Sequence, residues 1–227
     1  MPQKANIAIL IPCYNEELTV GSVIRDFHAA LPEADIYVYD NNSTDNTRAA
    51  AEATNIAVVR HAPIQGKGAV VRQMLTEISA DYYILVDGDA TYDSSGVNNM
   101  LWMMREQDLD MIVGDRSKSF EGEKWTHAFG NRLVDRMIRI KFGNKNVVDT
   151  MSGLRIFTRN IAEEFRKDIR HDGFEIETEM TLWCVTRGYN IGSWIIPYHK
   201  RPKGSVSKLN TFKDGWRIIK LILKTRR

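Results

Sequence analysis

The stretch Tyr82-Tyr83-Ile84-Leu85-Val86-Asp87-Gly88-Asp89 decides the fold class of this 227-residue chain. Its first five residues form a short apolar run rich in aromatic and β-branched side chains, which is typical of a buried strand. Two carboxylates, one residue apart, follow at the carboxyl end of that strand. Open α/β sheets bind ligands outside the carboxyl ends of their strands, and paired carboxylates there suit a hard divalent cation. For the tripeptide 87–89 taken alone, a solvated Asp-Gly turn is the alternative.

Apolar runs elsewhere in the chain alternate with amphipathic segments, which is the pattern of repeated βα units. We predict strands at residues 6–12, 35–40, 56–60, 82–86, 110–113, 154–157 and 191–196. We predict helices at residues 17–31, 44–54, 67–79, 129–142, 175–187 and 212–224. Such an order indicates an α/β fold with a mostly parallel central sheet and helices on both faces. Because no linker, internal repeat or low-complexity segment interrupts the pattern, we predict a single Rossmann-like domain.

The composition indicates a folded protein without a disulfide framework. Hydrophobic residues make up 43% of the chain, which is enough for a full core. The two cysteines, Cys13 and Cys184, lie in apolar surroundings, so we predict buried free thiols in a reducing, cytoplasmic setting. Residues 1–6 are polar and no run of 18 apolar residues exists, so we expect neither a signal peptide nor a membrane-spanning helix.

A net charge of +2 hides a strong asymmetry along the chain. Residues 200–227 contain ten basic residues and one acidic residue, whereas the other residues carry a net charge of −7. Within this basic tail, Phe212, Trp216, Ile219 and Leu223 recur at helical spacing and are flanked by lysine and arginine. We therefore predict an anionic partner near the C-terminus: phosphate, a membrane surface or nucleic acid.

Loops that follow several predicted strands carry polar groups to one edge of the sheet. Residues 12–17 and 40–45 contain carboxylates and amides, although either loop alone also suits an ordinary helix cap. Residues 65–68 begin like a dinucleotide fingerprint, but Val71 replaces its third glycine, so we reject that motif. A lysine at this helix start still favours an anion. The segment 201–208 combines Lys, Arg and Ser, which predicts an anion clamp, with a solvated loop as the alternative.

In order and spacing, these motifs resemble the family 2 glycosyltransferases of the GT-A fold, and among them the dolichyl- or polyprenyl-phosphate sugar synthases. The resemblance runs over nearly the whole chain. It rests on IPCYNEE (11–17), DNNSTDNT (40–47), QGKG (65–68), DGD (87–89), GDR (114–116), DTMSGLRIF (149–157), FEIETE (174–179) and GSVSK (204–208).

The resemblance implies a role for each matching position. The residues implied in nucleotide binding are Pro12, Tyr14, Glu16, Asp40, Lys67, Asp87, Arg201, Ser207 and Lys208. Asp89 would bind Mg²⁺ or Mn²⁺, and Thr91 stands where relatives often carry glutamine as a second metal ligand. Arg116 and Arg132 would hold an acceptor phosphate, although either arginine also suits a surface ion pair. Glu177 is the candidate general base if the acceptor is a hydroxyl.

We therefore expect a GT-A domain at residues 1–211, with a nucleotide-sugar half at 1–116, an acceptor half at 117–211 and a basic amphipathic helix at 212–227. The expected reaction is metal-dependent inverting transfer of a hexose from a UDP- or GDP-sugar to polyprenyl or dolichyl phosphate. The enzyme would be peripheral at the cytoplasmic face of a membrane, with the last helix either in the interface or capping the core. One alternative is a sugar hydroxyl as acceptor. A distant one is a nucleic-acid-binding module, which the acidic body disfavours.

Overall fold

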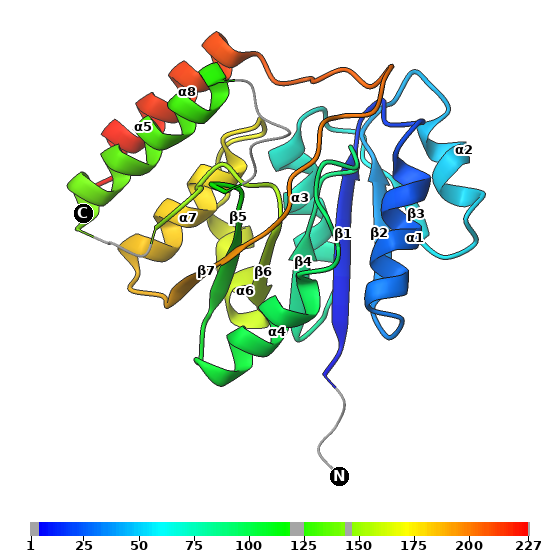
Figure 1. Ribbon diagram of the computed structural model, residues 1–227, viewed down its shortest axis with the longest axis horizontal. Coiled ribbons are helices and arrows are strands. Elements are labelled where there is room, and N and C mark those ends of the chain that lie inside the picture. Colours follow the sequence, from blue (N-terminus) through cyan, green and yellow to red (C-terminus); the bar gives the residue numbers. More distant parts are fainter. Residues whose placement is uncertain (1–4, 119–124, 144–146, 227) are drawn as a thin grey trace.

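A seven-stranded sheet forms the centre of the computed structural model, which describes residues 5–118, 125–143 and 147–226 (Figure 1). The strands are β1 (Ile7–Cys13), β2 (Asp35–Asp40), β3 (Val58–His61), β4 (Tyr82–Leu85), β5 (Met111–Asp115), β6 (Arg155–Thr158) and β7 (Ile191–Ile195). Their order is β3-β2-β1-β4-β6-β5-β7. Only β6 runs antiparallel to its neighbours among these named strands, so the prediction of a mostly parallel sheet is confirmed.

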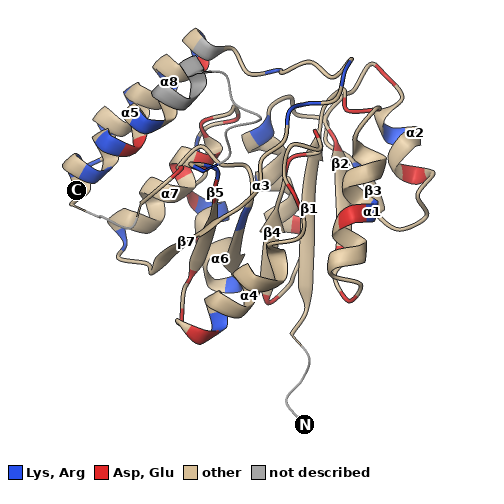
Figure 2. Ribbon diagram, in the orientation of Figure 1, with Lys and Arg blue, Asp and Glu red and all other residues tan. Residues whose placement is uncertain are grey.

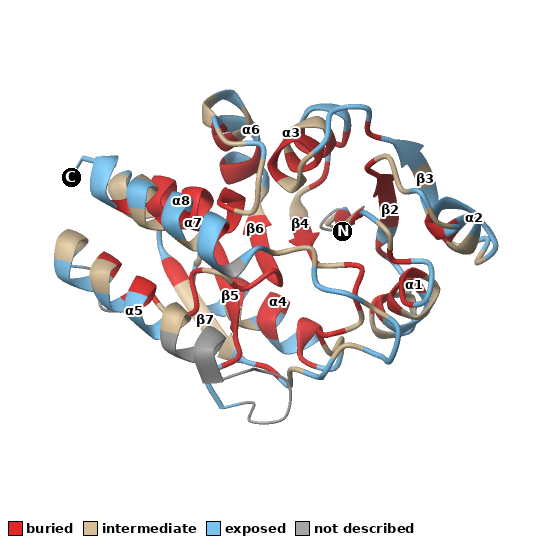
Figure 3. Cartoon of the chain, turned by 90° about the horizontal axis from the view of Figure 1, so that it is seen from above, coloured by how far each residue is buried: buried red, intermediate tan, exposed pale blue. Residues whose placement is uncertain are grey.

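Helices cover both faces of this sheet, as predicted. On one face lie α1 (Val20–Ala30), α2 (Thr47–Glu52) and α4 (Val97–Glu106); on the other lie α3 (Lys67–Glu77), α6 (Arg159–Asp168) and α7 (Ile176–Thr186). The side chains of β1 point alternately to the two faces of the sheet. Ile9 and Ile11 pack against the first helix layer, and Ala8 and Leu10 pack against the second. Viewed from above, the buried strands lie between these helix layers (Figure 3).

Two of these helices, α4 and α6, escaped prediction although their sequences carry a helical signal. Their buried apolar residues recur at spacings of three and four: Val97, Met100, Leu101 and Met104 in α4, and Ile161, Ala162 and Phe165 in α6. Both helices connect strands of the sheet, as the repeated βα pattern requires.

The last two long helices, α5 (Trp125–Phe142) and α8 (Thr211–Lys224), lie together along one edge of the molecule (Figure 1). Ile138 of α5 packs with Ile218 and Ile222 of α8 in a small third core cluster. The ammonium group of Lys141 donates hydrogen bonds to the carbonyls of Ile222 and Leu223, at 2.7 and 2.8 Å, which ties the ends of the two helices. The amphipathic C-terminal helix therefore does cap the core, but through the stripe at 218 and 222.

The apolar stripe that we predicted on α8 lies on its other side. Phe212, Trp216 and Leu223 are 91%, 67% and 62% exposed, and Ile219 is half-buried. Both cysteines are buried free thiols, as predicted. Across the described part of the chain, no helix combines the length and apolarity that crossing a bilayer requires.

Candidate functional site

A large cleft of about 1140 Å³ opens at the carboxyl ends of the central strands and extends to α8. The predicted site residues that line it are Pro12, Tyr14, Glu16, Lys67, Asp87, Asp89, Thr91, Arg116, Glu177, Arg201, Ser207 and Lys208. Two predicted residues are not among its lining. Asp40 is buried at the end of β2, and Arg132 is exposed on α5, whose neighbouring residues 131 and 133 do line the cleft.

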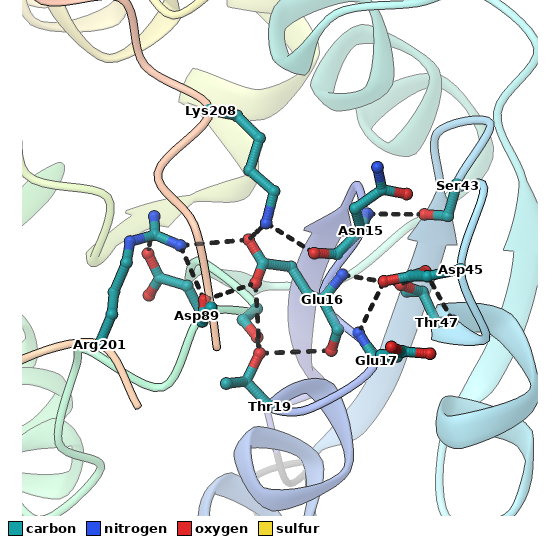
Figure 4. Close-up of polar contacts among 12 residues, drawn as sticks. Asn15, Glu16, Glu17, Thr19, Ser43, Asp45, Thr47, Asp89, Arg201 and Lys208 are labelled. Carbon is teal, nitrogen blue, oxygen red and sulfur yellow. Dashed lines mark hydrogen bonds and ion pairs between the residues drawn. The ribbon is translucent and has the colours of Figure 1, made fainter. Parts of the chain in front are cut away.

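The loop after β1 is held in place by the loop after β2 and by the end of β4. The amide of Asn15, a residue in the left-handed region with φ of 54°, donates to Ser43 Oγ at 2.9 Å. The amide of Glu16 donates to Thr47 Oγ1 at 2.7 Å, and Thr19 Oγ1 donates to the carbonyl of Gly88 at 2.7 Å. Motif residues 43–47 thus orient Glu16 toward the cleft, and α2 begins only at Thr47 (Figure 4).

At the end of β2, the side chains of Asp40 and Asn41 have different roles. Asn41 supports the next loop, because its Oδ1 accepts the amide of Gly66 at 2.7 Å and its Nδ2 donates to the carbonyl of Ile64 at 2.7 Å. Asp40 is 6% exposed, and its buried Oδ1 has no hydrogen-bond partner among the described residues. A buried carboxylate oxygen in this condition is costly unless a donor satisfies it, so a ligand N–H fits here.

Lys67, Asp87 and Glu177 form a buried charge cluster, which we call the inner cluster. The Lys67 ammonium group makes ion pairs with both carboxylates, which come from the end of β4 and from α7. Burial alone would lower the pKa of Lys67, but Asp87 and Glu177 reverse this effect and raise it. Burial is the largest single influence on the pKa of Asp87 and would raise it, yet Lys67, aided by Arg201 and Arg116, holds that pKa below its usual value. Lys67 and Asp87 therefore both remain charged.

The predicted anion site at the start of α3 is wrong. The amide of Gly68 donates to the backbone carbonyl of Asp172 at 2.9 Å, so the protein itself occupies this helix start. A Cβ at either Gly66 or Gly68 would come within 2.1 Å of a backbone oxygen of the segment 171–172. These glycines permit a close approach of two backbones, and Lys67 points into the inner cluster instead.

Asp89 and Glu16 form a second charge cluster, the outer cluster, with Arg201 and Lys208. Arg201 makes an ion pair with Asp89 and another with Glu16 Oε1 at 3.3 Å, and Lys208 Nζ lies 2.6 Å from the same Glu16 oxygen (Figure 4). Burial raises the pKa of Asp89 above its usual value, and Asp87 adds to this rise, while Arg201 opposes it.

The chemistry of the outer cluster fits a divalent cation held jointly with a ligand. Asp89 is 3% exposed, and its Oδ1 accepts the hydroxyl of Thr91 at 2.6 Å, which orients the carboxylate. The role of Thr91 as a metal ligand itself stays a prediction. No group of three or more His, Cys, Asp or Glu side chains within the described residues is arranged to hold a metal ion. Mg²⁺ and Mn²⁺ suit such a site, because they bind through few carboxylates together with substrate phosphates.

Arg116 lies buried at the wall of the cleft and is largely committed to the protein. Its Nε and Nη2 donate to the two carboxylate oxygens of Asp149 at 2.7 and 2.6 Å. The rings of Tyr198 and Tyr92 lie 5.0 and 6.0 Å from the guanidinium carbon. We did not single out either tyrosine from the sequence, although Tyr92 follows Thr91 directly.

Arg155 is a further residue that the sequence did not reveal. It is fully buried, and its guanidinium donates to the carbonyls of Ser152, Glu177 and Thr150 at 2.7, 2.9 and 3.2 Å. It thereby fastens the motif at residues 149–157 to the start of α7, which carries Glu177.

The far wall of the cleft is formed by α8, which we had treated as a separate segment. Phe212, Trp216 and Ile219 bring apolar surface to it, and Lys213 and Arg217 bring positive charge. The cleft thus has a charged end at the strands and an apolar, basic end at α8.

Comparison with known proteins decides the family. Residues 8–166, more than half of the chain, match the family described as Glycosyl transferase family 2. The chain belongs to this family. The predicted resemblance is confirmed, and the protein is a glycosyltransferase.

Several relatives of this family 2 glycosyltransferase are similar over most of its length. It is 36% identical to the glycosyltransferase AglJ of Haloferax volcanii over 220 residues, which are 95% of this chain and 70% of the relative. It is 27% identical to a dolichyl-phosphate hexose transferase of the same organism, over 96% of this chain and 93% of the relative.

Solved structures confirm the GT-A fold. The glucosyl-3-phosphoglycerate synthase of Mycobacterium tuberculosis, crystallised with Mn²⁺, UDP-glucose and phosphoglyceric acid, matches with a TM-score of 0.73. The match covers 98% of this chain and 80% of that one at 17% identity, and at this identity it shows the fold alone.

Proposed function

We propose that this enzyme transfers a hexose, with inversion and with a divalent metal, from a UDP- or GDP-sugar to a polyprenyl or dolichyl phosphate. One observation carries the proposal: a single cleft joins the carboxylates at the strand ends to an apolar and basic wall made by α8. A nucleotide-sugar suits the first end. An amphiphile with an anionic head suits the second.

Asp40 supports a UDP- or GDP-sugar as donor. Its buried, unpaired Oδ1 accepts hydrogen bonds, and uracil and guanine each present a ring N–H that can donate one. Cytosine and adenine present an unprotonated ring nitrogen at the corresponding position, which would face the carboxylate with a second acceptor. Pro12 and Tyr14, which line the cleft, would flank the nucleoside.

The outer cluster supports departure of the nucleotide. Mg²⁺ or Mn²⁺, held by Asp89 and the diphosphate, would supply positive charge where the leaving group gains negative charge. Arg201, Ser207 and Lys208 line the same region and would bind the diphosphate oxygens. Residues 1–116 would thus bind the donor together with the segment 201–208.

The ion pair that Glu177 forms with Lys67 favours a phosphate acceptor. The carboxylate of Glu177 is held by Lys67 in the inner cluster, which is a poor arrangement for taking a proton from a sugar hydroxyl. An acceptor phosphate is already anionic at neutral pH and needs no such base. Arg116, Lys213 and Arg217 line the cleft and would attract that phosphate, with Arg132 exposed beside the cleft on α5, so we extend the acceptor half at 117–211 to include α8.

The exposed side of α5 and α8 favours a lipid acceptor at a membrane surface. Every exposed charged side chain described on these two helices is basic: Arg132, Arg136, Arg139, Lys213, Arg217, Lys220 and Lys224. Figure 2 shows basic positions along both helices. Their acidic residues, Asp135 and Asp214, are buried. Between the basic residues lie Ile140 and Trp216, 68% and 67% exposed. Such a surface suits the interface of an anionic bilayer.

The acceptor is tested by transfer from radiolabelled UDP- and GDP-hexoses with Mn²⁺ to three acceptors: a polyprenyl phosphate, the matching polyprenol and an oligosaccharide. We expect product from the phosphate only, and an E177Q variant within about tenfold of the wild type, since general base catalysis contributes 10²–10⁴-fold. E164Q, which changes an exposed glutamate, is the control. Product from the oligosaccharide, lost in E177Q but not in E164Q, would favour the hydroxyl alternative.

Membrane binding is tested by sedimentation with vesicles that contain anionic lipid. We expect W216A to bind several-fold more weakly than the wild type. W102A is the matched control, because Trp102 is 60% exposed but lies on α4, away from the proposed surface. Equal loss in both variants would contradict a membrane surface on α5 and α8.

A further inference from the structure

The outer cluster brings together groups that the proposed reaction needs for other purposes. Asp89 is the carboxylate for the metal, and Arg201 and Lys208 are the cations for the diphosphate. In the structure these groups bind one another: Arg201 bridges Asp89 and Glu16, while Lys208 bonds to Glu16 and to the carbonyl of Asn15 at 2.6 Å. Ser205 Oγ, from the same segment, lies 3.5 Å from Glu16 Oε2.

These contacts compete with the proposed ligands for the same atoms. The Asp89 oxygen that pairs with Arg201 Nη2 is one of only two that this carboxylate offers a cation. The Asp89 side chain is 5% exposed and that of Arg201 27% exposed, so the solvent screens this pair weakly. A divalent cation bound at Asp89 would repel a guanidinium that stayed in contact with the same carboxylate.

The segment that carries both cations is suited to changing partners. Residues 199–210 form neither helix nor strand, and they hold Arg201 and Lys208 seven residues apart. Asp89, by contrast, is fixed by the hydrogen bond that it accepts from the Thr91 hydroxyl, and the backbone of Glu16 is fixed by the hydrogen bond that its N–H donates to Thr47 Oγ1. Asp89 and Glu16 are thus held in place, whereas Arg201 and Lys208 lie in a segment without regular secondary structure.

We infer that Arg201 and Lys208 exchange partners: they neutralise Asp89 and Glu16 in the protein alone, and they turn to the diphosphate when metal and nucleotide bind together. This inference rests on the proposed function and adds the regulation of its donor site. Metal alone must displace Arg201 from Asp89 and leaves it only the longer contact with Glu16, at 3.3 Å, so metal alone binds weakly. Nucleotide supplies a new anion, and the coupling between the two ligands is reciprocal.

If Arg201 exchanges partners in this way, its loss should change the affinities for metal and for nucleotide in opposite directions. An R201Q variant releases Asp89 from its ion pair, so Mn²⁺ alone should bind more tightly than it does to the wild type. The same variant lacks a diphosphate ligand, so UDP or GDP in the presence of Mn²⁺ should bind more weakly. An arginine that only held the diphosphate would leave the affinity for Mn²⁺ alone unchanged.

The experiment is an electron paramagnetic resonance titration of free Mn²⁺ with the full chain, without nucleotide and with saturating UDP or GDP. The variants are R201Q and K208Q. R48Q is the control, because Arg48 forms an exposed ion pair with Glu52 within α2 and is not a member of the outer cluster. Thermal unfolding of each variant shows that it is folded.

We expect Mn²⁺ alone to bind R201Q about fivefold to tenfold more tightly than wild type and R48Q, within the usual range of coupling between sites. K208Q should change in the same direction by less, because Lys208 reaches Glu16 and not Asp89. Unchanged or weaker binding of Mn²⁺ alone by both variants would overturn the exchange. If the wild type bound no nucleotide with Mn²⁺ at all, the proposed function itself would fail, which is a separate result.

Discussion

Asp87 and Asp89 lie one residue apart at the end of β4, yet they belong to charge clusters of opposite character. The inner cluster joins Asp87 to residues carried by α3 and α7, and it holds the pKa of Asp87 below its usual value despite burial. The outer cluster joins Asp89 to two loops, and burial together with Asp87 raises the pKa of Asp89. The cation of the inner cluster thus lies on a helix, whereas those of the outer cluster lie on a loop, where the proposed exchange would release Asp89 to a ligand.

The largest expected effect separates the clusters by activity. D89N should lower the proposed hexosyl transfer by roughly 10³-fold, which corresponds to several kcal/mol of the charge stabilisation that a bound metal would supply. The fold should persist, because the inner cluster is intact. The measurement is kcat beside the thermal unfolding midpoint, with D81N as the control on an exposed aspartate. Full activity of D89N would remove Asp89 from the metal site.

The next largest effect is a loss of folding stability when the cation of the inner cluster is removed. K67M leaves Asp87 and Glu177 as neighbouring carboxylates without their cation, which should cost about 3 kcal/mol of unfolding free energy, the usual result of breaking a buried ion pair. Urea unfolding measures this change. K167M is the matched control, because Lys167 forms an exposed pair with Glu164 and its loss should cost less than about 0.5 kcal/mol. Equal midpoints for the two variants would contradict the structural role of the inner cluster.

The smallest effect is a dependence of stability on pH, measured in a chelator. Because the folded state raises the pKa of Asp89, its ionised form destabilises the fold above that pKa, and this penalty is relieved as the pH falls through it. D89N should therefore be more stable than wild type at pH 7, with the difference shrinking in acid. For Asp87 the sign is opposite: its lowered pKa stabilises the fold above the unfolded-state pKa of about 3.9, and this stability is lost in acid.

A D87N variant should accordingly be less stable than the wild type at pH 7 and should approach it below about pH 4. Urea midpoints from pH 3 to 8 for both variants make the comparison. Shifts of the same sign for D87N and D89N at pH 7 would contradict the distinction between the clusters.

The sequence was most informative where topology alone brings residues together. Parallel strands end at one edge of a sheet, so the polar residues that follow β1, β2 and β4 had to gather there. The sequence could not show that Gly66 and Gly68 meet the segment 171–172, or that Arg116 pairs with Asp149, because such contacts join distant segments without a spacing rule. On α8 two apolar stripes share one helix, and only the packing with α5 shows that Ile218 and Ile222 face the core.

The most direct test is thermal unfolding of the full chain with UDP, GDP, CDP or ADP, each with and without Mn²⁺. We predict that UDP or GDP stabilises the protein, and only when Mn²⁺ is present. At a concentration about 100 times the dissociation constant, the gain should be about 2.7 kcal/mol. Stabilisation by ADP or CDP instead would contradict the role of Asp40, and stabilisation by none of the four would contradict a metal-dependent nucleotide-sugar site at the ends of β1, β2 and β4.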